Sequence, residues 1–468
     1  MNTIFLQPSD VLFFRDGRPM SGSLAGHGAA WPLPNVVSAA FHAALHRAKL
    51  GVIGGGGLHT HRQGASGVYA EHAPRDRKFG SLQTVGPFPV WQRTNWYFPR
   101  PLDLLDAGLE PALSPTAGVR PEQSSLPAPL QFGVGNLRGP KKESSAKAWL
   151  SRTAFESYLG SANPGGPAGA AEQPGVDDRE IFDPEQTIGI AIDPESGTAG
   201  QGVAAGQIYS AHYLRLQEGW QLGVGASAHD KDFHHPRHGS DLIVSLLEGE
   251  TGRILVGGQQ RHCTATRAGG PFSVLPNGCR DGFPAKDGSW LLKWILLSPA
   301  IWPAMEADEA RGIHPHGGGW LPNWICPQTG QVLLKTGEVA RRPGERREVW
   351  RLRVQREQPG IDARLVAAVV PKPLVVSGWS LPDEAVGEAG GAQSTHLAVP
   401  AGAVYYFQAQ SAAAATALAA ALNWHGADAG SQAGAVKNRR STLLGEKGFG
   451  LGVCGRWQFF EDVAGRSV

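Results

Sequence analysis

Glycine and proline constrain this 468-residue chain more than any other feature of its sequence. Its 63 glycines and 35 prolines make up about a fifth of all residues. Both residue types interrupt regular elements, so the composition predicts many turns and short strands rather than a helical bundle. Because 41% of the residues are hydrophobic and 18% are charged, the chain can bury a real core, and its length indicates two or three domains.

The four cysteines are sparse and far apart in the sequence: Cys263, Cys279, Cys326 and Cys454. Their spacing suits neither a disulfide framework nor a zinc knuckle, which indicates a reducing cytoplasm. The first residues contain no basic stretch followed by a long apolar run, and no apolar run anywhere is long enough to cross a bilayer. We therefore expect a cytoplasmic protein without a membrane contact.

Basic residues cluster although the net charge is only +2. They outnumber acidic residues in the segments 41–100 and 335–372. Local positive surface on a nearly neutral protein predicts a defined nucleic-acid groove rather than general stickiness. For the segment 335–372, a solvated face of mixed charge is an equally good interpretation.

Hydrophobic periodicity predicts strands interrupted by a few helices. In the first 200 residues we expect strands at 3–14, 82–91, 96–104 and 188–192, with helices at 35–49 and 146–159. In the rest we expect strands at 207–216, 289–297, 349–354, 365–370 and 404–408, with helices at 241–247 and 411–422. Low-complexity segments at 106–130 and 160–177 read as connectors. This order favours two α+β sandwiches over a doubly wound parallel sheet.

A glycine-rich run near the end of the chain, 445–452, contains four glycines in eight residues and follows Lys437, Arg439 and Arg440. Glycine lets bare backbone approach a ligand, so successive N–H groups can line a concavity for phosphate oxygens, with Lys447 adding charge. A polyanionic ligand is one interpretation of this run. A tight turn between two strands is the other.

Ten fragments spread over nearly the whole chain resemble one known family, in its order. They lie at 12–19, 32–35, 85–88, 97–103, 189–193, 207–210, 257–261, 377–379, 399–406 and 445–452. Together they resemble the RAMP-superfamily, Cas-five-like subunit of type III-B CRISPR (Cmr) effector complexes, the third Cmr subunit, which holds the 5′ tag of the crRNA. The connectors at 54–64, 106–130 and 160–177 fit no motif of this family.

The resemblance implies an α+β protein of two ferredoxin-like (RRM-like) domains with inserted loops and a short helical insertion. We expect the first domain at 1–200, with its insertion at about 106–187, and the second at 201–468, ending in the glycine-rich loop. The family role is non-catalytic and needs no cofactor or metal. The implied partners are the crRNA 5′ tag, the large polymerase-cyclase subunit, a backbone RAMP subunit and, indirectly, target RNA, in antiviral defence.

The candidate RNA-binding residues come from both ends of the chain. Two arginines beside a helix N-terminus are usual elements of a phosphate site, and aromatic rings can stack on single-stranded bases. On these grounds we select Arg15, Arg18, Asn35, Arg261, Lys437, Arg439, Arg440, Lys447, Gly448, Phe449 and Gly450. For each of them a structural role stays open: a surface turn for Arg15 and Arg18, a strand cap for Arg261, and a core position for Phe449. Trp379 and Trp457 are better explained as core residues.

Two other functions are weighed against RNA scaffolding. RNA cleavage needs a general base, an acid and a cation, and His27 with Arg18 could supply two of these, as in RAMP-type crRNA-processing endoribonucleases. A tryptophan-rich carbohydrate-binding module has only composition in its favour. Histidines at 229–238, with His314 and His316, could suggest a metal, but a solvated loop explains them better.

Overall fold

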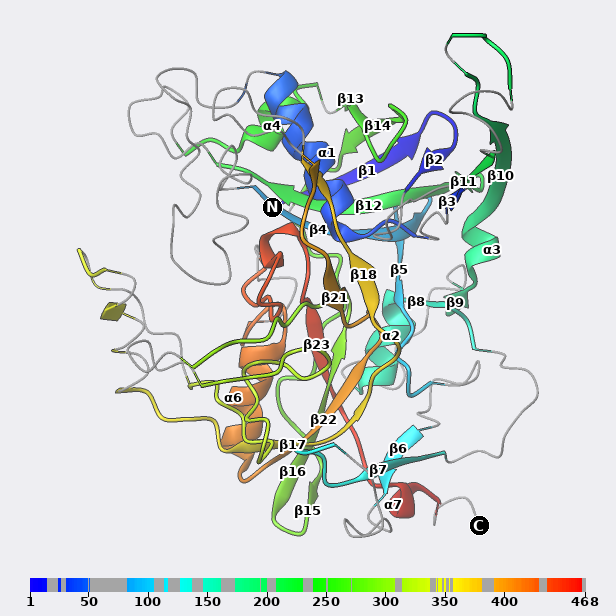
Figure 1. Cartoon of the computed structure of the whole chain (residues 1–468). Coiled ribbons are helices and arrows are strands. Elements are labelled where there is room, and N and C mark those ends of the chain that lie inside the picture. The colour runs from blue at the N-terminus through cyan, green and yellow to red at the C-terminus, as the bar shows by residue number, and fades with distance from the viewer. Residues whose placement is uncertain are drawn as a thin grey trace.

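The computed structural model describes most of the chain: residues 1–14, 24–26, 31–48, 50, 82–104, 113–116, 127–136, 146–160, 173–193, 195–199, 208–229, 239–249, 251–270, 272–307, 314–336, 342, 344–346, 349–350, 353, 357–380, 391–428 and 436–464. Two large antiparallel sheets lie one above the other in Figure 1, with a few helices on them. The predicted α+β class is confirmed. Among the described residues, no helix is both long and apolar enough to cross a bilayer.

The upper sheet has eight strands in the order β13-β14-β1-β12-β4-β5-β8-β9. β12 is antiparallel to both β1 and β4, so β1 and β4 run parallel with β12 between them, joined through α1. This is a split βαβ unit. The bounds are β1 Asn2–Pro8, α1 Pro34–Arg47, β4 Gln83–Trp91, β5 Asn95–Pro99, β8 Trp149–Ser151, β9 Gly175–Val176, β12 Trp220–Ser227, α4 Leu242–Leu246, β13 Thr251–Leu255 and β14 His262–Arg267.

Alternation along β1 explains why the upper sheet has apolar layers on both faces. Ile4 and Leu6 are fully buried in the same cluster as Val37 and Phe41 of α1. The intervening Phe5 belongs to the other cluster, which continues into the lower sheet. Period-two alternation in a strand and 3.6-residue spacing in a helix thus fix which face α1 covers.

The lower sheet repeats the arrangement. Its central strand β16 lies between β22 and β23, and β22 is antiparallel to both β16 and β17. Between β22 and β23 runs α6, whose Ala415, Leu418 and Leu422 are buried in the core. The bounds are β15 Ala285–Lys286, β16 Ser289–Leu296, β17 Ala363–Val369, β22 Val404–Ala409, α6 Ala412–Leu422 and β23 Gly452–Arg456.

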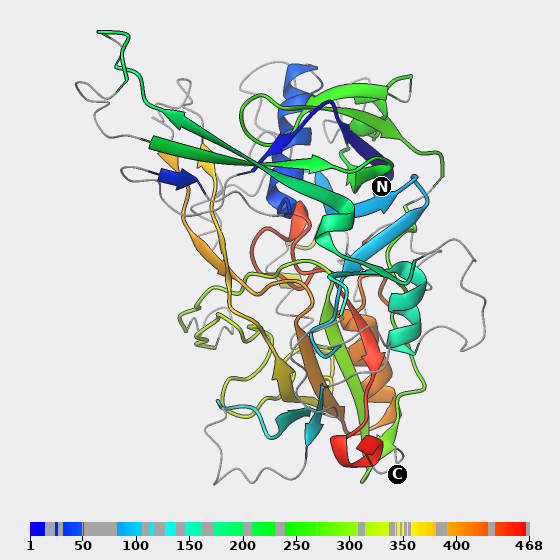
Figure 2. The same cartoon turned by 90° about the vertical axis from the view of Figure 1, so that its right-hand side faces the viewer.

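A long hairpin of β10 and β11 projects from the edge of the molecule (Figures 1 and 2). Its strands are β10 Phe182–Ile190 and β11 Ile208–Leu216, flanked by β2 Leu12–Phe13 and β3 Leu24–Gly26 and preceded by α3 Asp178–Ile181. The remaining elements are short: β6 Leu113–Thr116, β7 Gly133–Asn136, α2 Arg152–Leu159, β18 Leu374–Val376, β19 Trp379–Ser380, β20 Gly391–Ala392, β21 His396–Ala398, η6 Gly445–Lys447 and α7 Phe460–Ala464.

The predicted division at 200/201 does not coincide with the division between the sheets. β12, β13 and β14, all beyond residue 200, pair into the upper sheet, and the lower sheet begins at β15. Which sheet a strand joins depends on pairing partners that are distant in sequence, and local sequence patterns do not reveal those partners. The strand order of each sheet fits a ferredoxin-like unit, and that description of both halves remains a prediction.

Several predicted elements differ in detail. The opening strand is broken between β1 and β2, and the expected helix 146–159 starts as strand β8 before α2. The strand expected at 349–354 is wrong, because Val349, Trp350 and Arg353 are helical. β12 was not predicted, since its glycines weaken the strand pattern, although all eight of its residues are buried.

A fully buried polar cluster joins the two sheets. Asp103, just after β5, accepts from Lys293 Nζ of β16 at 2.8 Å and from the Tyr158 hydroxyl of α2 at 2.5 Å. The Tyr406 hydroxyl of β22 donates to the same carboxylate at 3.2 Å. Burial lowers the pKa of Lys293, which Asp103 opposes, and burial raises the pKa of Tyr158 and Tyr406. The buried carboxylate of Asp103 is thus paired with a cation and with two hydroxyl donors.

Replacing Lys293 by Met is expected to cost about 3–5 kcal/mol, because the Asp103 charge stays buried without its cation. The measurement is the urea midpoint of unfolding. The double variant Lys293→Met with Asp103→Leu should recover part of the stability. As a control, Lys286→Met removes a partly exposed pair with Asp462 and should change the midpoint much less. Equal decreases at the two lysines would contradict this role.

Candidate nucleic-acid interface

The glycine-rich run folds as a tight turn against the first part of the chain. It contains the short 3₁₀ helix η6, between Leu444 at φ 57° and Gly448 at φ 102°. A Cβ at Gly448 would lie 3.1 Å from the Thr84 carbonyl oxygen and 3.3 Å from Pro34 Cβ. The turn therefore touches the start of β4 and the N-terminus of α1, and the two ends of the chain meet here.

The start of α1 adds a positive helix end to this place. Pro34 is the first helical residue, where a missing N–H costs nothing. The first turn holds no acidic residue, so no carboxylate there offsets the positive end of the dipole. Asn35 Nδ2 donates to the Ser377 carbonyl at 3.3 Å. Sequence reasoning thus placed the helix start correctly.

Arg439 and Arg440 are buried and donate hydrogen bonds to main-chain carbonyls, whereas the sequence predicted that they present charge to a ligand. Arg439 Nη1 donates to the carbonyls of Thr84 at 2.8 Å and Gly445 at 2.7 Å, so it ties the turn to β4. Arg440 Nε donates at 2.6 Å to the Ala421 carbonyl in the last turn of α6. Burial lowers the pKa of both guanidinium groups to about 10, and both stay protonated at pH 7.

Phe449 is fully buried in a small cluster with Ile301, Leu443 and Leu444. A ring with no exposed surface cannot stack on a base in this arrangement. The predicted stacking role therefore does not fit, whereas its alternative, a core phenylalanine that anchors the turn, does. Gly450 at φ 75° is equally structural, because a Cβ there would lie 2.0 Å from Ser441 N.

Three buried polar atoms around the turn lack a hydrogen-bond partner among the described residues. They are Asn35 Oδ1, Thr84 Oγ1 and Arg439 Nη2. Buried donors and acceptors are normally paired, so an unpaired group of this kind is a feature of binding sites as well as of strained ones. Lys447, the last residue of η6, is half-buried and carries a positive charge.

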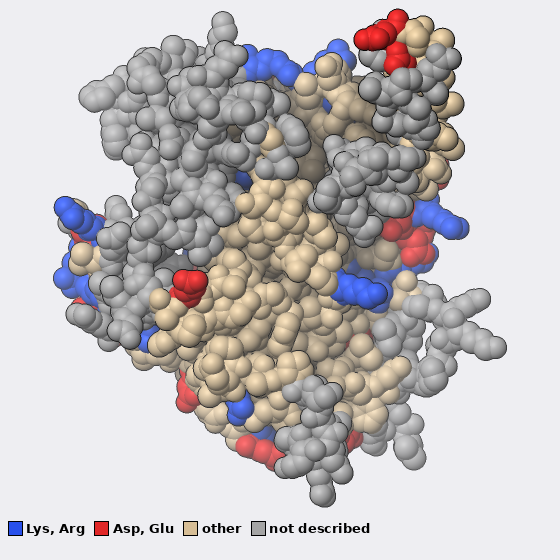
Figure 3. All heavy atoms as spheres, in the orientation of Figure 1, with Lys and Arg blue, Asp and Glu red and all other residues tan. Residues whose placement is uncertain are grey.

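The other predicted residues do not join this group. Arg261 lies beside β11, with its guanidinium 5.1 Å from the Tyr213 ring centroid and Nη1 3.4 Å from Asp10 Oδ2. Lys437 is exposed and forms an ion pair with Asp428. Arg15, Arg18 and His27 lie outside the described residues. On the face shown in Figure 3, the visible Lys and Arg side chains form small separate groups.

The structure describes some of the histidines and tryptophans that the sequence analysis weighed as metal ligands or core residues. The His316 ring is fully used by main chain, with Nδ1 accepting from Gly318 N at 2.8 Å and Nε2 3.1 Å from the Ile325 carbonyl. Among the described residues no group of three or more His, Cys, Asp or Glu could hold a metal. Trp457 is a core residue as predicted, with Nε1 donating to the carbonyls of Leu292 and Phe407. The side chain of Trp379 and residues 230–238 lie outside the described part.

Sequence reasoning missed one candidate surface, on the projecting hairpin. Four isoleucines expose their side chains there: Ile188 by 72%, Ile190 by 54%, Ile192 by 64% and Ile208 by 51%. Ile190 pairs with Ile208 across the ladder, and the isoleucines of β10 follow at period two, so they share one face. The alternation of isoleucines at 188, 190 and 192 is the sequence signal for this surface, because an apolar row on one face of a strand is normally covered by another element or molecule. A row of exposed isoleucines indicates a surface that another molecule covers.

The fold defines a class of protein, an α+β chain of two stacked antiparallel sheets with a projecting hairpin. A family model described as CRISPR-associated protein (Cas_Cmr3) matches residues 4–457. The chain therefore belongs to this family of CRISPR-associated proteins, which confirms the resemblance seen in the sequence. No curated protein sequence matches the chain.

Two solved structures show similarity at low identity. A chain in the cryo-EM structure of the type III-B Cmr-beta bound to cognate target RNA aligns over 86% of both chains, with 11% identity and a TM-score of 0.37. A chain in the crystal structure of the Csm3-Csm4 subcomplex of the type III-A CRISPR-Cas interference complex aligns over 86% of this chain and 92% of that one. Its identity is 8% and its TM-score is 0.30.

Substituting Gly450 by Ala should destabilise the turn by more than its backbone angle alone explains. Gly239→Ala is the matched control, because Gly239 has a similar φ of 78° and open space around its Cβ position. The angle alone costs about 1–2 kcal/mol, and Gly450→Ala adds the contact with Ser441 N. Thermal unfolding of both variants measures the difference. Equal shifts in the two variants would show that the turn is not packed as described.

Proposed function

We propose that this chain is a non-catalytic RNA-binding subunit of a type III-B CRISPR ribonucleoprotein. In this role it anchors the 5′ tag of the crRNA and bridges the large polymerase-cyclase subunit to the backbone RAMP subunits in the cytoplasm. The observation that carries the proposal is the contact of Gly448 with Pro34 and Thr84, where glycine-rich backbone meets a helix N-terminus. Family membership supports the same conclusion.

The physical basis is a phosphate contact made by main chain and a few cations. A helix N-terminus attracts anions, and glycine-rich backbone lets phosphate oxygens approach the N–H groups. Lys447 then supplies charge at the end of the turn, while Arg439 holds the turn in place from within. We also assign Arg15 and Arg18 to the tag contact, because both precede the N-terminus of α1 in the sequence. Asn35 offers an acceptor for a base or ribose.

Charge reversal at Lys447 tests the tag contact. Lys447→Glu should weaken binding of tag-containing RNA by about ten- to a hundredfold, because removing a charge-assisted hydrogen bond costs about 1.5–3 kcal/mol. The slope of log affinity against log salt should become shallower by about 0.7 for each phosphate of a single strand that the variant no longer neutralises. Filter binding over a salt series measures both. Arg253→Glu changes an exposed arginine outside both basic segments and serves as the control.

Unchanged affinity in Lys447→Glu, or an equal decrease in Arg253→Glu, would contradict the assignment to the turn. The same titrations also test the non-catalytic part of the proposal. RNA recovered after incubation should be intact, and products ending in a 2′,3′-cyclic phosphate would support the endoribonuclease alternative with His27 as base. Arg439 and Arg440 are unsuitable for charge reversal, because their substitution would disrupt the packing of the turn and of α6.

The isoleucine row on β10 and β11 supports a role within an assembly. Ile188→Thr combined with Ile190→Thr should leave the fold of the isolated chain unchanged, since both side chains are mostly exposed. The same variant should reduce co-purification of partner subunits or RNA several-fold, because covering apolar surface stabilises complexes. Thr187→Ala, on the other face of the strand, is the control. Normal recovery of the complex with the double variant would remove the hairpin from the interface.

A further inference from the structure

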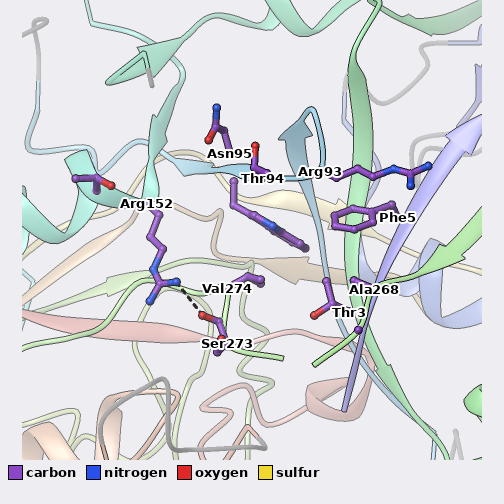
Figure 4. A pocket seen from close by; sticks show the side chains of 12 residues that line it. Thr3, Phe5, Arg93, Thr94, Asn95, Arg152, Ala268, Ser273 and Val274 are labelled. Carbon is purple, nitrogen blue, oxygen red and sulfur yellow. Dashed lines mark hydrogen bonds between the residues drawn. The ribbon is translucent and has the colours of Figure 1, made fainter. Parts of the chain in front are cut away.

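A polar cavity of about 400 Å³ lies on the face of the upper sheet opposite α1 (Figure 4). Its walls come from four segments: Thr3 and Phe5 of β1, the turn from β4 to β5, the first residues of α2, and the segment that follows β14. It shares no residue with the glycine-rich turn. Its size is within the range of small-molecule sites.

The net charge of the cavity comes from Arg93, because the second lining arginine, Arg152, is ion-paired with Glu156. None of its twelve described lining residues is acidic, whereas Arg93 and Arg152 stand on opposite sides of it (Figure 4). Arg152 is held against the wall, with Nη1 donating to the Ser273 carbonyl at 2.8 Å and Nε 3.1 Å from Glu156 Oε1. Arg93 is exposed at the rim, is in no ion pair among the described residues, and lies 5.9 Å from the Phe5 ring centroid. The cavity therefore favours an anion.

The rest of the lining is aromatic and polar. Trp96 and Phe5 border the cavity at a centroid distance of 6.1 Å, with only 4% and 5% of their surfaces exposed. Hydroxyl and amide groups of Thr94, Asn95 and Thr153 line it as well. The first turn of α2 adds the positive end of a helix dipole to the same wall. The exposed cation suits a phosphate, and the hydrogen-bonding rim suits the polar groups of a ribose or a base.

We propose that this cavity binds one phosphorylated nucleoside, with its phosphate at Arg93 and its base near Trp96. The ligand is either a free mononucleotide or one nucleotide unit of a single RNA strand. The inference goes beyond the tag contact, because it uses different residues. Arg93 suits such a role, since it is exposed and lines the cavity.

Gly269 offers a way to close the cavity without disturbing the fold. It lines the cavity, its φ is not left-handed, and a Cβ there would meet nothing within 4 Å. Gly269→Phe should therefore fold normally and fill the space that the ligand would occupy. Gly317→Phe is the matched control, since Gly317 is equally unobstructed and lies outside the cavity. Equal unfolding midpoints for both variants and the wild type would establish that the fold is intact.

Isothermal titration of the full chain with AMP, adenosine and ribose 5-phosphate tests the ligand. AMP should bind most tightly, and Gly269→Phe should weaken it at least tenfold while Gly317→Phe does not. Arg93→Asn removes the cation and tolerates the left-handed angle, and it should weaken AMP about tenfold with little effect on adenosine. Arg253→Ala, an exposed arginine on β13, controls for overall charge.

A twelve-residue oligouridylate without the tag distinguishes the two sources of the nucleotide. If AMP does not bind but the oligouridylate does, and Gly269→Phe abolishes that binding, the ligand is a unit of a strand. Binding of neither probe, or binding unchanged in Gly269→Phe, would overturn the proposal. Tag-containing RNA should bind Gly269→Phe normally and Lys447→Glu weakly, so failure at the cavity and failure at the turn are separable.

Discussion

The buried ion pair of Asp103 and Lys293 is the interaction on which the arrangement of the two sheets depends. Asp103 follows β5 of the upper sheet, and Lys293 lies on β16 of the lower one. Removing two charges from water carries a large desolvation cost. Here two tyrosine hydroxyls also donate hydrogen bonds to the carboxylate and offset part of that cost. Tyr158 brings α2 into the same cluster, so one polar group sets the places of both sheets and of the helix between them. The cavity beside α2 and the contact of the glycine-rich turn with β4 both follow from that placement.

Basic residues in this protein serve two different purposes. Arg439 and Arg440 would count as nucleic-acid contacts by their spacing, yet their guanidinium groups donate to main-chain carbonyls of β4, the turn and α6. Lys447 and Arg93, in contrast, present charge at the surface of the turn and at the rim of the cavity. The two internal arginines are almost completely buried, whereas Lys447 is half-buried and Arg93 is exposed. Arg439 stabilises the backbone of the glycine-rich turn, and Arg440 donates to the last turn of α6.

Three surfaces with different chemistry are therefore distributed over one chain. The turn at α1 combines backbone and charge, the hairpin offers apolar side chains, and the cavity combines arginine with aromatic rings. They are formed by different residues. Such a distribution suits a subunit of a CRISPR-associated assembly, in agreement with the family to which the chain belongs.

Local pattern determined much of this protein: the α+β class, helices α1 and α6, strands such as β4, β11 and β16, the core position of Trp457, and the family itself. It also indicated that the glycine-rich run is exceptional, because four glycines in eight residues need an unusual backbone. The tertiary structure alone decided that β12 to β14 complete the upper sheet, that Phe449 and the two arginines face inward, and that the cavity exists. The physical reason is that periodicity reports how one segment alternates between inside and outside, whereas strand pairing, ion pairs and cavities depend on partners up to hundreds of residues away.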